Sequence, residues 1–174
     1  ADANHNNIPD CCEQGSLTEG LVAYYPFDGN PNDASGHGHH ANQFDTVPTN
    51  DRFGVANSAY RFNGTSAYVT ASGVPIPSNN AFTWSVWINA DQPNANRPII
   101  ERAQAIGNNL MSPHLWTSPD ASLRFGSYDF ATGGSSVFTP PGSLPANQWL
   151  HFAGTSAANG RRAAYINGQL VAEG

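Results

Sequence analysis

The chain has 174 residues and a net charge of −6, and only 11% of its residues are charged. It contains no lysine, and its arginines are scattered apart from Arg161-Arg162, which excludes the basic footprint of a nucleic-acid-binding protein. No apolar run approaches the length needed to span a membrane. Gly, Asn, Pro, Ser and Thr dominate the polar positions, a mixture typical of a turn-rich β protein.

The chain opens with a polar segment. Residues 1–16 lack hydrophobic periodicity, so we interpret them as a loop or linker in front of a single domain over residues 17–174. From residue 17 onward, short apolar or alternating runs are separated by turn signals. The first of these runs spans residues 21–27, and a polar, Gly-rich loop from 28 to 40 follows it.

The middle of the chain contains two strand signals. Residues 60–62 and 67–70 flank Asn63-Gly64, which predicts a hairpin. Asn63-Gly64-Thr65 also fits the pattern of a glycosylation acceptor, although the turn is the favoured interpretation. The strict alternation over 82–88 predicts a strand that places Phe82, Trp84, Val86 and Ile88 on one face.

Further strands are expected in the second half. They are predicted over 98–102, over 115–117 and 122–125 around Pro119-Asp120, and over 149–155 and 162–166 around Asn159-Gly160. Asn159-Gly160 is typical of a type I′ turn, and Asn167-Gly168 turns the chain once more. No stretch of a dozen residues has a helical period. Many short strands at regular spacing predict an all-β sandwich or barrel.

Five pieces of the sequence, in this order, resemble bacterial laminin G-like domains of the concanavalin A-like superfamily. They cover residues 20–40, 60–69, 82–88, 149–154 and 164–170. The resemblance implies a two-sheet antiparallel jelly-roll sandwich, and relatives that bind glycans or proteins or serve as structural appendages. Such domains usually continue with more strands, so we expect this sandwich to lack its last strands after Gly174, which would leave an unpaired sheet edge.

The N-terminal segment has the oxygen spacing of a calcium loop. The ligands at positions 1, 3, 5, 7, 9 and 12 of that loop would be Asp2, Asn4, Asn6, Ile8 through its carbonyl, Asp10 and Glu13. Asn7 stands where glycine normally makes the sharp turn, and asparagine tolerates the left-handed conformation. The segment resembles the loops of thrombospondin type 3 and dockerin-like repeats. The alternative is a disordered, Asn-rich linker.

A second oxygen-rich loop contains Asp28, Asn30 and Asp33. Domains of the resembled family often hold a structural calcium ion here, and the alternative is a turn held by Asx hydrogen bonds. His37, His39 and His40 follow, and we interpret them as surface imidazoles rather than transition-metal ligands.

The only two cysteines, Cys11 and Cys12, are adjacent. Their Cα atoms are about 3.8 Å apart across a trans peptide, closer than an ordinary disulfide prefers. An intermolecular disulfide, free thiols and a strained vicinal bridge therefore all remain open.

No catalytic constellation is evident. The four glutamates, at 13, 19, 101 and 173, do not form the closely spaced carboxylate pair of a glucanase. We therefore expect a non-catalytic protein, with Trp116 and Tyr128 as candidate ligand-binding residues.

The sequence as a whole favours an extracellular module, secreted or at the cell surface. We expect it to use calcium as a cofactor and to bind a glycan or protein ligand of the cell surface or matrix, in adhesion or carbohydrate recognition. The alternative is a self-assembling structural subunit of a surface appendage or filament, in which copies associate by strand complementation.

Overall fold

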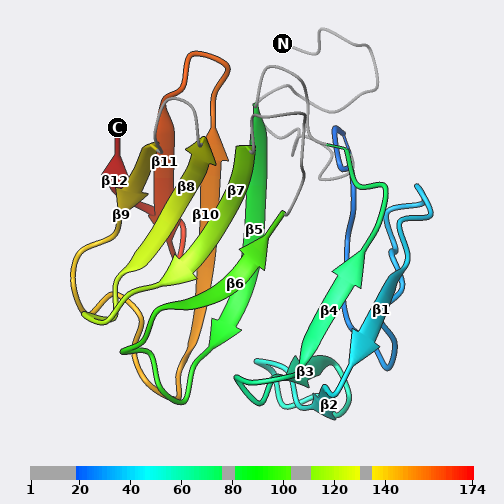
Figure 1. Cartoon of the computed structure of the whole chain (residues 1–174). Helices are drawn as coiled ribbons and strands as arrows, with labels where there is room; N and C mark the ends of the chain where they lie inside the picture. The colour runs from blue at the N-terminus through cyan, green and yellow to red at the C-terminus, as the bar shows by residue number, and fades with distance from the viewer. Residues whose placement is uncertain (1–18, 76–80, 103–110, 130–134) are drawn as a thin grey trace, which may run out of the picture. The chain divides into compact units, whose positions relative to one another are not determined.

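The computed structural model describes residues 19–75, 81–102, 111–129 and 135–174 (Figure 1). Over these residues the chain forms twelve strands and no helix, which confirms the all-β prediction. None of this part of the chain could therefore cross a membrane as a helix. The chain divides into two compact units, Ala1–Pro75 (unit 1) and Ile76–Gly174 (unit 2).

Within residues 19–75, unit 1 contains two antiparallel sheets of two strands each. In one sheet, β1 (Ala41–Phe44) pairs with β4 (Tyr68–Ala71). In the other, β2 (Val47–Thr49) pairs with β3 (Ala59–Arg61). The hairpin expected around Asn63-Gly64 is therefore wrong, because β3 and β4 pair with different strands.

A side-chain cap explains why the chain turns at Asn63 without forming a hairpin. Asn63 Oδ1 accepts hydrogen bonds from the backbone amides of Thr65, Ser66 and Ala67 at 2.9–3.0 Å. Local bonds of this kind satisfy the backbone without any cross-strand ladder. The chain can then leave one sheet of unit 1 and enter the other.

The first apolar run, residues 21–27, does not form a strand. Its backbone bonds instead to the Gly-rich loop: the Tyr24 amide donates to Asp33 Oδ1, and the Tyr24 carbonyl accepts from the amide of Ala34. Phe27 ends the run with a positive φ of 61°. A polar loop partner therefore replaces the neighbouring strand that the apolar pattern suggested.

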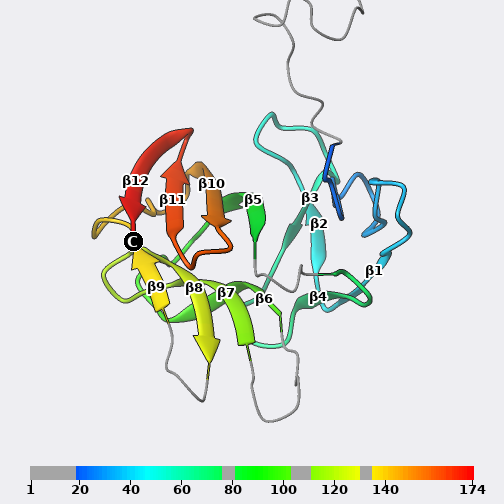
Figure 2. The same ribbon diagram turned by 90° about the horizontal axis from the view of Figure 1, so that it is seen from above.

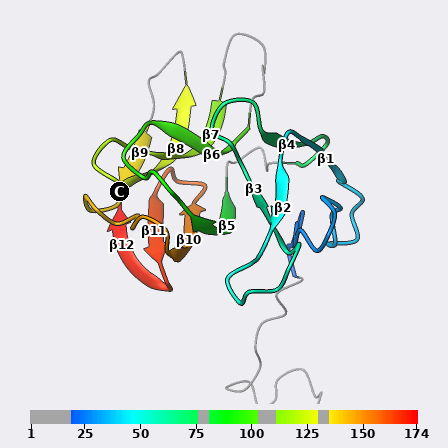
Figure 3. The ribbon, with the colours of Figure 1, turned by 90° about the horizontal axis from the view of Figure 1, so that it is seen from below.

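Unit 2 is built from two antiparallel sheets of four strands. The first sheet has the order β12–β11–β10–β5, and its strands are β5 (Phe82–Asn89), β10 (Trp149–Ser156), β11 (Arg162–Ile166) and β12 (Gln169–Glu173). The second has the order β6–β7–β8–β9, and its strands are β6 (Arg97–Glu101), β7 (Met111–Thr117), β8 (Leu123–Asp129) and β9 (Ser135–Phe138). The two sheets lie as facing layers, seen from above in Figure 2 and from below in Figure 3. The predicted two-sheet sandwich is thus confirmed.

Residue alternation decides which side chains enter the space between these sheets. On β5, Phe82, Trp84, Val86 and Ile88 are half-buried and pack against the core, whereas the residues between them are exposed. β10 pairs with β5 along its whole length and alternates in the same way. A period of two is what a strand with one covered face requires.

The Asn-Gly turns differ from each other. At Asn159-Gly160 only Gly160 has a positive φ, so the type I′ turn expected there is wrong. At Asn167-Gly168 both residues have positive φ values, 49° and 81°, as a type I′ turn requires. This second turn joins β11 to β12.

Phe125 of β8 lies at the centre of the core. It is fully buried, and its ring centroid lies 5.9 Å from that of Phe82, 6.1 Å from that of Trp84 and 5.9 Å from that of Phe152. Those three rings belong to the opposite sheet, so one side chain joins the two layers. Such aromatic pairs contribute about 0.5–1.5 kcal/mol each beyond the area they bury.

The Phe125 ring can approach the opposite sheet closely because the residue that it meets there is a glycine. A Cβ atom at Gly154 of β10 would lie only 2.8 Å from three ring atoms of Phe125. Gly154 therefore sets how closely the sheets approach at this point.

A polar bridge crosses the same gap. Arg162 of β11 is 8% exposed, and its Nη2 donates to Ser127 Oγ of β8 at 2.6 Å. Its Nη1 donates to the carbonyl of Gly160 at 3.3 Å. Burial lowers the pKa of the Arg162 guanidinium from its ordinary value, but arginine stays charged in proteins, so a cation sits between the sheets.

We predict that Gly154→Ala lowers the free energy of unfolding by about 1–3 kcal/mol, because the new methyl group overpacks the core against Phe125. Urea unfolding followed by tryptophan fluorescence measures this change. The double variant Gly154→Ala/Phe125→Leu should be less destabilised than the sum of its single variants, since leucine leaves room for the methyl group. Strictly additive effects of the two substitutions would contradict the proposed contact.

Candidate functional site

The predicted N-terminal calcium loop lies outside the described residues. Its ligands Asp2, Asn4, Asn6, Ile8, Asp10 and Glu13 therefore stay a prediction, and so does an intermolecular disulfide through Cys11 or Cys12, which lie in the same segment.

Asp33 organises the Gly-rich loop of unit 1. Its side chain is 6% exposed. Oδ1 accepts from the amides of Tyr24 and Ser35, and Oδ2 accepts from the Ser35 hydroxyl and the His39 amide, all at 2.8–3.0 Å. The Tyr25 hydroxyl donates to the His39 carbonyl at 2.7 Å and closes the loop from the other side. One carboxylate thus fixes both ends of the loop.

These hydrogen bonds determine the charge state of Asp33. Burial alone would raise the pKa of its carboxyl group, but the bonds from Tyr24, Ser35 and His39 outweigh that effect. They hold the pKa well below its usual value of 3.8, because each of them favours the ionised form. Asp33 is therefore a carboxylate at any physiological pH.

The second candidate calcium site contains Asp33 together with Asp28 and Asn30. Asn30 Oδ1 accepts from the amide of Asn32 at 2.9 Å, and Asn30 Nδ2 donates to the Asp28 carbonyl at 3.1 Å. The Asx hydrogen bonds of the alternative interpretation are thus present. A carboxylate has about four acceptor positions, and Asp33 already receives four hydrogen bonds. A calcium ion would have to displace some of them, and calcium at this loop stays a prediction.

No cluster of three or more His, Cys, Asp or Glu side chains suited to a metal ion occurs within 19–75, 81–102, 111–129 and 135–174. The imidazoles of His37 and His39 are stacked, with ring centroids 6.4 Å apart. His40 Nδ1 accepts a hydrogen bond from the Asp33 amide at 3.2 Å, which assigns it to the loop.

The candidate residue Trp116 lies on β7, in the second sheet of unit 2. It is half-buried, and its Nε1 atom is buried without a hydrogen-bond partner. Its backbone partners are Pro98 on β6 and Arg124 on β8. Leu115 beside it faces the core, so by alternation Trp116 lies on the outer face. Tyr128 is on β8, and its side chain is not among those that the structure describes.

A polar network lies beside Trp116. Arg124 Nε donates to Ser136 Oγ of β9 at 3.2 Å, and the same oxygen lies 3.4 Å from His114 Nε2 of β7. Gly126 of β8 pairs with both His114 and Ser136, and so lies between them. A side chain at Gly126 would collide with Ser136 Oγ, so the glycine allows Ser136 to reach across β8.

The outer face of the first sheet presents a different aromatic group. Trp87 of β5 is 42% exposed, and its ring centroid lies 5.2 Å from that of His151 of β10. Ser85 Oγ lies 2.8 Å from His151 Nε2 and holds the imidazole in place. We call Ser85, Trp87 and His151 the Trp87 platform. The strict alternation of residues 82–88 already placed Trp87 on the outer face, but the sequence analysis did not select it.

The Asn167-Gly168 turn holds the backbone of one platform residue, His151. The Asn167 amide donates to the His151 carbonyl at 2.9 Å, and Asn167 Oδ1 accepts from the His151 amide at 3.0 Å. His151 is thus fixed through its backbone as well as through its ring. Small residues, Ala153 and Ser85, continue the face along the ladder towards Tyr165 of β11. The indole of Trp87 and the ring of Tyr165 are thus separated by small side chains on this face.

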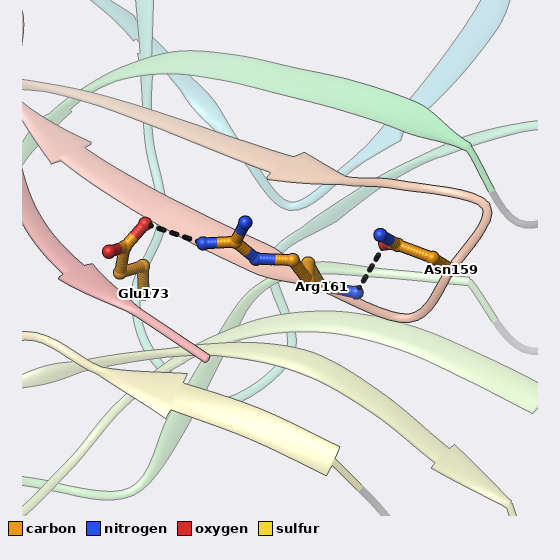
Figure 4. A network of polar contacts seen from close by, with 3 residues as sticks. All are labelled: Asn159, Arg161 and Glu173. Atoms are coloured by element: carbon orange, nitrogen blue, oxygen red, sulfur yellow. Dashed lines mark hydrogen bonds and ion pairs between the residues drawn. The ribbon is translucent and has the colours of Figure 1, made fainter.

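At the far end of the same sheet, Figure 4 shows a surface ion pair. Arg161 Nη2 lies 3.2 Å from Glu173 Oε2, and the Arg161 amide donates to Asn159 Oδ1 at 3.0 Å. The two charged side chains are 68% and 55% exposed. A pair this exposed contributes little to stability, so Arg161 and Glu173 offer a neutralised surface rather than a binding charge.

Comparison with known protein families identifies a family for this chain. A laminin G family model, described as the concanavalin A-like lectin/glucanases superfamily, matches residues 63–174. The matched span takes in β4 and all of unit 2. No curated protein and no solved structure matches the chain.

We predict that the Asp33 carboxyl group titrates at a lower pH in the folded chain than an aspartate does in an unfolded one. Its folded-state pKa is depressed, so its stabilising effect is present above the unfolded value of about 3.9 and is lost as the pH falls towards the folded value. Carbon-detected NMR of the carboxyl groups measures the midpoint. An Asp33 midpoint at or above 3.9 would contradict the hydrogen-bonded loop.

The matching substitution is Asp33→Asn. It should destabilise unit 1 at pH 7 by about 1–3 kcal/mol, because an amide cannot accept all four bonds. The difference from the unsubstituted chain should shrink as the pH is lowered below about 4. Hydrogen exchange at the amides of Ser35 and His39 reports the change locally, and Asp28→Asn is the exposed control.

Proposed function

Because the chain belongs to the concanavalin A-like lectin/glucanases superfamily, we propose that it is an extracellular carbohydrate-recognition module that binds its ligand without cleaving it. Domains of the laminin G type bind glycans or proteins, and they are generally non-catalytic. Of these two ligand classes, we infer that the glycan is the ligand of this chain.

The observation that carries the proposal is the Trp87 platform. The Trp87 side chain is 42% exposed on an outer sheet face, so a ligand can reach its indole. The C–H groups of a pyranose ring can pack on the negatively polarised face of such an indole. Ser85 and His151 add groups that can hydrogen-bond to sugar hydroxyls at the edge of the ring.

The positions of the acidic residues support a non-catalytic role. Glycosidases place two carboxyl groups on either side of the bond that they cleave. Here Glu101 lies on β6 of the second sheet and Glu173 lies on β12 of the first. Glu173 is paired with Arg161 besides. Neither glutamate lies on β5 or β10, the two strands that supply the Trp87 platform.

An extracellular location and a structural calcium ion complete the proposal. Laminin G-like domains are typically extracellular, and Asp2, Asn4, Asn6, Ile8, Asp10 and Glu13 have the spacing of a calcium loop.

The alternative function, self-assembly into an appendage or filament, stays a prediction. The feature that bears on it is β12, which, like β5, is an edge strand of the first sheet among the described residues. A strand from another copy could add to such an edge. Glu173 near the end of β12 works against that addition, because charges on edge strands oppose it.

We predict that the chain binds neutral oligosaccharides and that Trp87→Ala weakens this binding by about 2 kcal/mol, roughly thirtyfold in Kd, because the variant loses its central aromatic anchor. A glycan array selects the ligand, and isothermal titration calorimetry measures its Kd. Trp87→Phe, which keeps an aromatic ring, should lose less.

The control for this experiment is Tyr24→Ala, which removes an aromatic ring that is 52% exposed in unit 1. It should bind as the unsubstituted chain does. Equal binding by Trp87→Ala and the unsubstituted chain would refute the Trp87 site. Release of shortened oligosaccharides by the purified protein would refute the non-catalytic role.

We predict that residues 2–13 bind calcium and that the double variant Asp2→Ala/Asp10→Ala abolishes this binding, because charged oxygens dominate calcium affinity. Calorimetric titration of chelator-treated protein measures it. Asp28→Ala should retain the N-terminal site and so separates it from the second loop. If the double variant bound calcium as well as the unsubstituted chain, the assignment to residues 2–13 would be wrong.

A further inference from the structure

We propose that the outer face of the β6–β7–β8–β9 sheet carries a second, independent site, which binds a carboxylated saccharide through Arg124. The proposal depends on the proposed function only in taking a saccharide as the ligand. It uses a different sheet and different side chains from the Trp87 platform.

The site is a row of three residues across three adjacent strands. Trp116 of β7 is the backbone partner of Arg124 of β8, and Arg124 is the partner of Phe138 of β9. Cross-strand partners on one face bring their Cβ atoms to about 4.5–5.5 Å. Arg124 therefore lies between Trp116 and Phe138 in the ladder, and its guanidinium approaches the phenyl ring of Phe138. We call these residues the Arg124 row.

The guanidinium is held in place by its neighbours. Nε donates to Ser136 Oγ at 3.2 Å, and Cζ stands 5.7 Å from the ring centroid of Phe138. Ser136 can occupy that position because Gly126 leaves the space above β8 empty. Neither terminal nitrogen atom of Arg124 has an acceptor among the residues of the described ranges. The planar fork is thus oriented in advance and free to bind a planar anion with two hydrogen bonds.

The charges on this face favour an anion. No carboxylate of the described part of the chain forms an ion pair with Arg124. The acidic residue nearest in the ladder is Glu101, which is the partner of His114 and lies two strands from Arg124, on β6. Arg124 therefore keeps its full charge in a protein whose net charge is −6. A carboxylate ligand would complement the row locally.

The aromatic residues select a sugar acid over a simple anion. Phe138 is 54% exposed, and Trp116 is half-buried, so each offers apolar surface beside the cation. A pyranose ring that carries a carboxyl group can pack on one of these rings while the carboxylate meets the Arg124 fork. Trp116 Nε1, a buried donor without an acceptor, would gain one from an oxygen of the ligand after a small rotation of the indole.

The test compares an oligogalacturonate with the same oligosaccharide after its carboxyl groups have been reduced to alcohols. Calorimetry should show that the chain binds the acidic form and binds the reduced form at least about tenfold more weakly, because a hydrogen bond to a charged group is lost. Arg124→Gln should weaken binding of the acidic form roughly ten- to hundredfold, whereas Arg124→Lys, which keeps the charge but not the fork, should lose less.

Two controls separate this site from the rest of the surface. Arg161→Gln removes an exposed arginine of the other sheet and should leave binding unchanged. Trp87→Ala should also leave binding of the acidic form unchanged, even if it abolishes binding of neutral glycans. Loss of both ligands in Trp87→Ala would instead mean that a single site binds them, and would overturn the independent site.

A spectroscopic readout covers the case in which Arg124→Gln fails to fold. In a ¹⁵N–¹H spectrum of the unsubstituted chain, the indole resonance of Trp116, assigned from a Trp116→Phe variant, should shift when oligogalacturonate is added. An unshifted Trp116 resonance at saturating ligand would overturn the proposal. Equally tight binding of a polyglutamate peptide would show a general carboxylate site, and would overturn the assignment to a saccharide.

Discussion

The contact between Phe125 and Gly154 is the constraint on which the sandwich depends. The fully buried ring of Phe125, on the second sheet, packs against the backbone of the first sheet at Gly154. Three aromatic residues of the first sheet surround it. Because interiors are packed as closely as organic crystals, this contact fixes the separation of the sheets as well as their attraction. The buried bridge from Arg162 to Ser127 acts across the same gap, and it is polar and directional where the aromatic contact is not.

With both inner faces occupied, every side chain available for a ligand must come from an outer face, a loop or an edge. The outer faces differ in chemistry. The first sheet presents a neutral indole that is supported by an imidazole and a hydroxyl. The second presents an arginine whose neighbours across the ladder are a tryptophan and a phenylalanine. One fold can therefore hold two kinds of binding surface, because alternation along each strand separates residues that pack from residues that recognise.

Unit 1 is stabilised in another way. Its four strands are short and its buried apolar residues are few, and two-stranded sheets alone are only marginally stable in water. Asp33 compensates with four hydrogen bonds, one from the Tyr24 amide and three from Ser35 and His39 of its own loop. An ionised carboxylate inside a loop has its lone pairs committed to the chain, and this limits what it can offer to a metal ion. Side-chain chemistry, rather than apolar burial, shapes this part of the chain.

The sequence by itself determined the all-β class, the two-faced strand over 82–88 and the turns that separate the later strands, because a period of two and the backbone preferences of glycine and asparagine act locally. Only the tertiary structure decided that β3 and β4 take different partners, and that Asn167-Gly168 rather than Asn159-Gly160 forms the type I′ turn. The tertiary structure also brings His114 close to Ser136 across Gly126, because this contact requires three strands in a fixed register. Partner choice, register and exposure depend on contacts between residues far apart in the chain, and no local pattern encodes them.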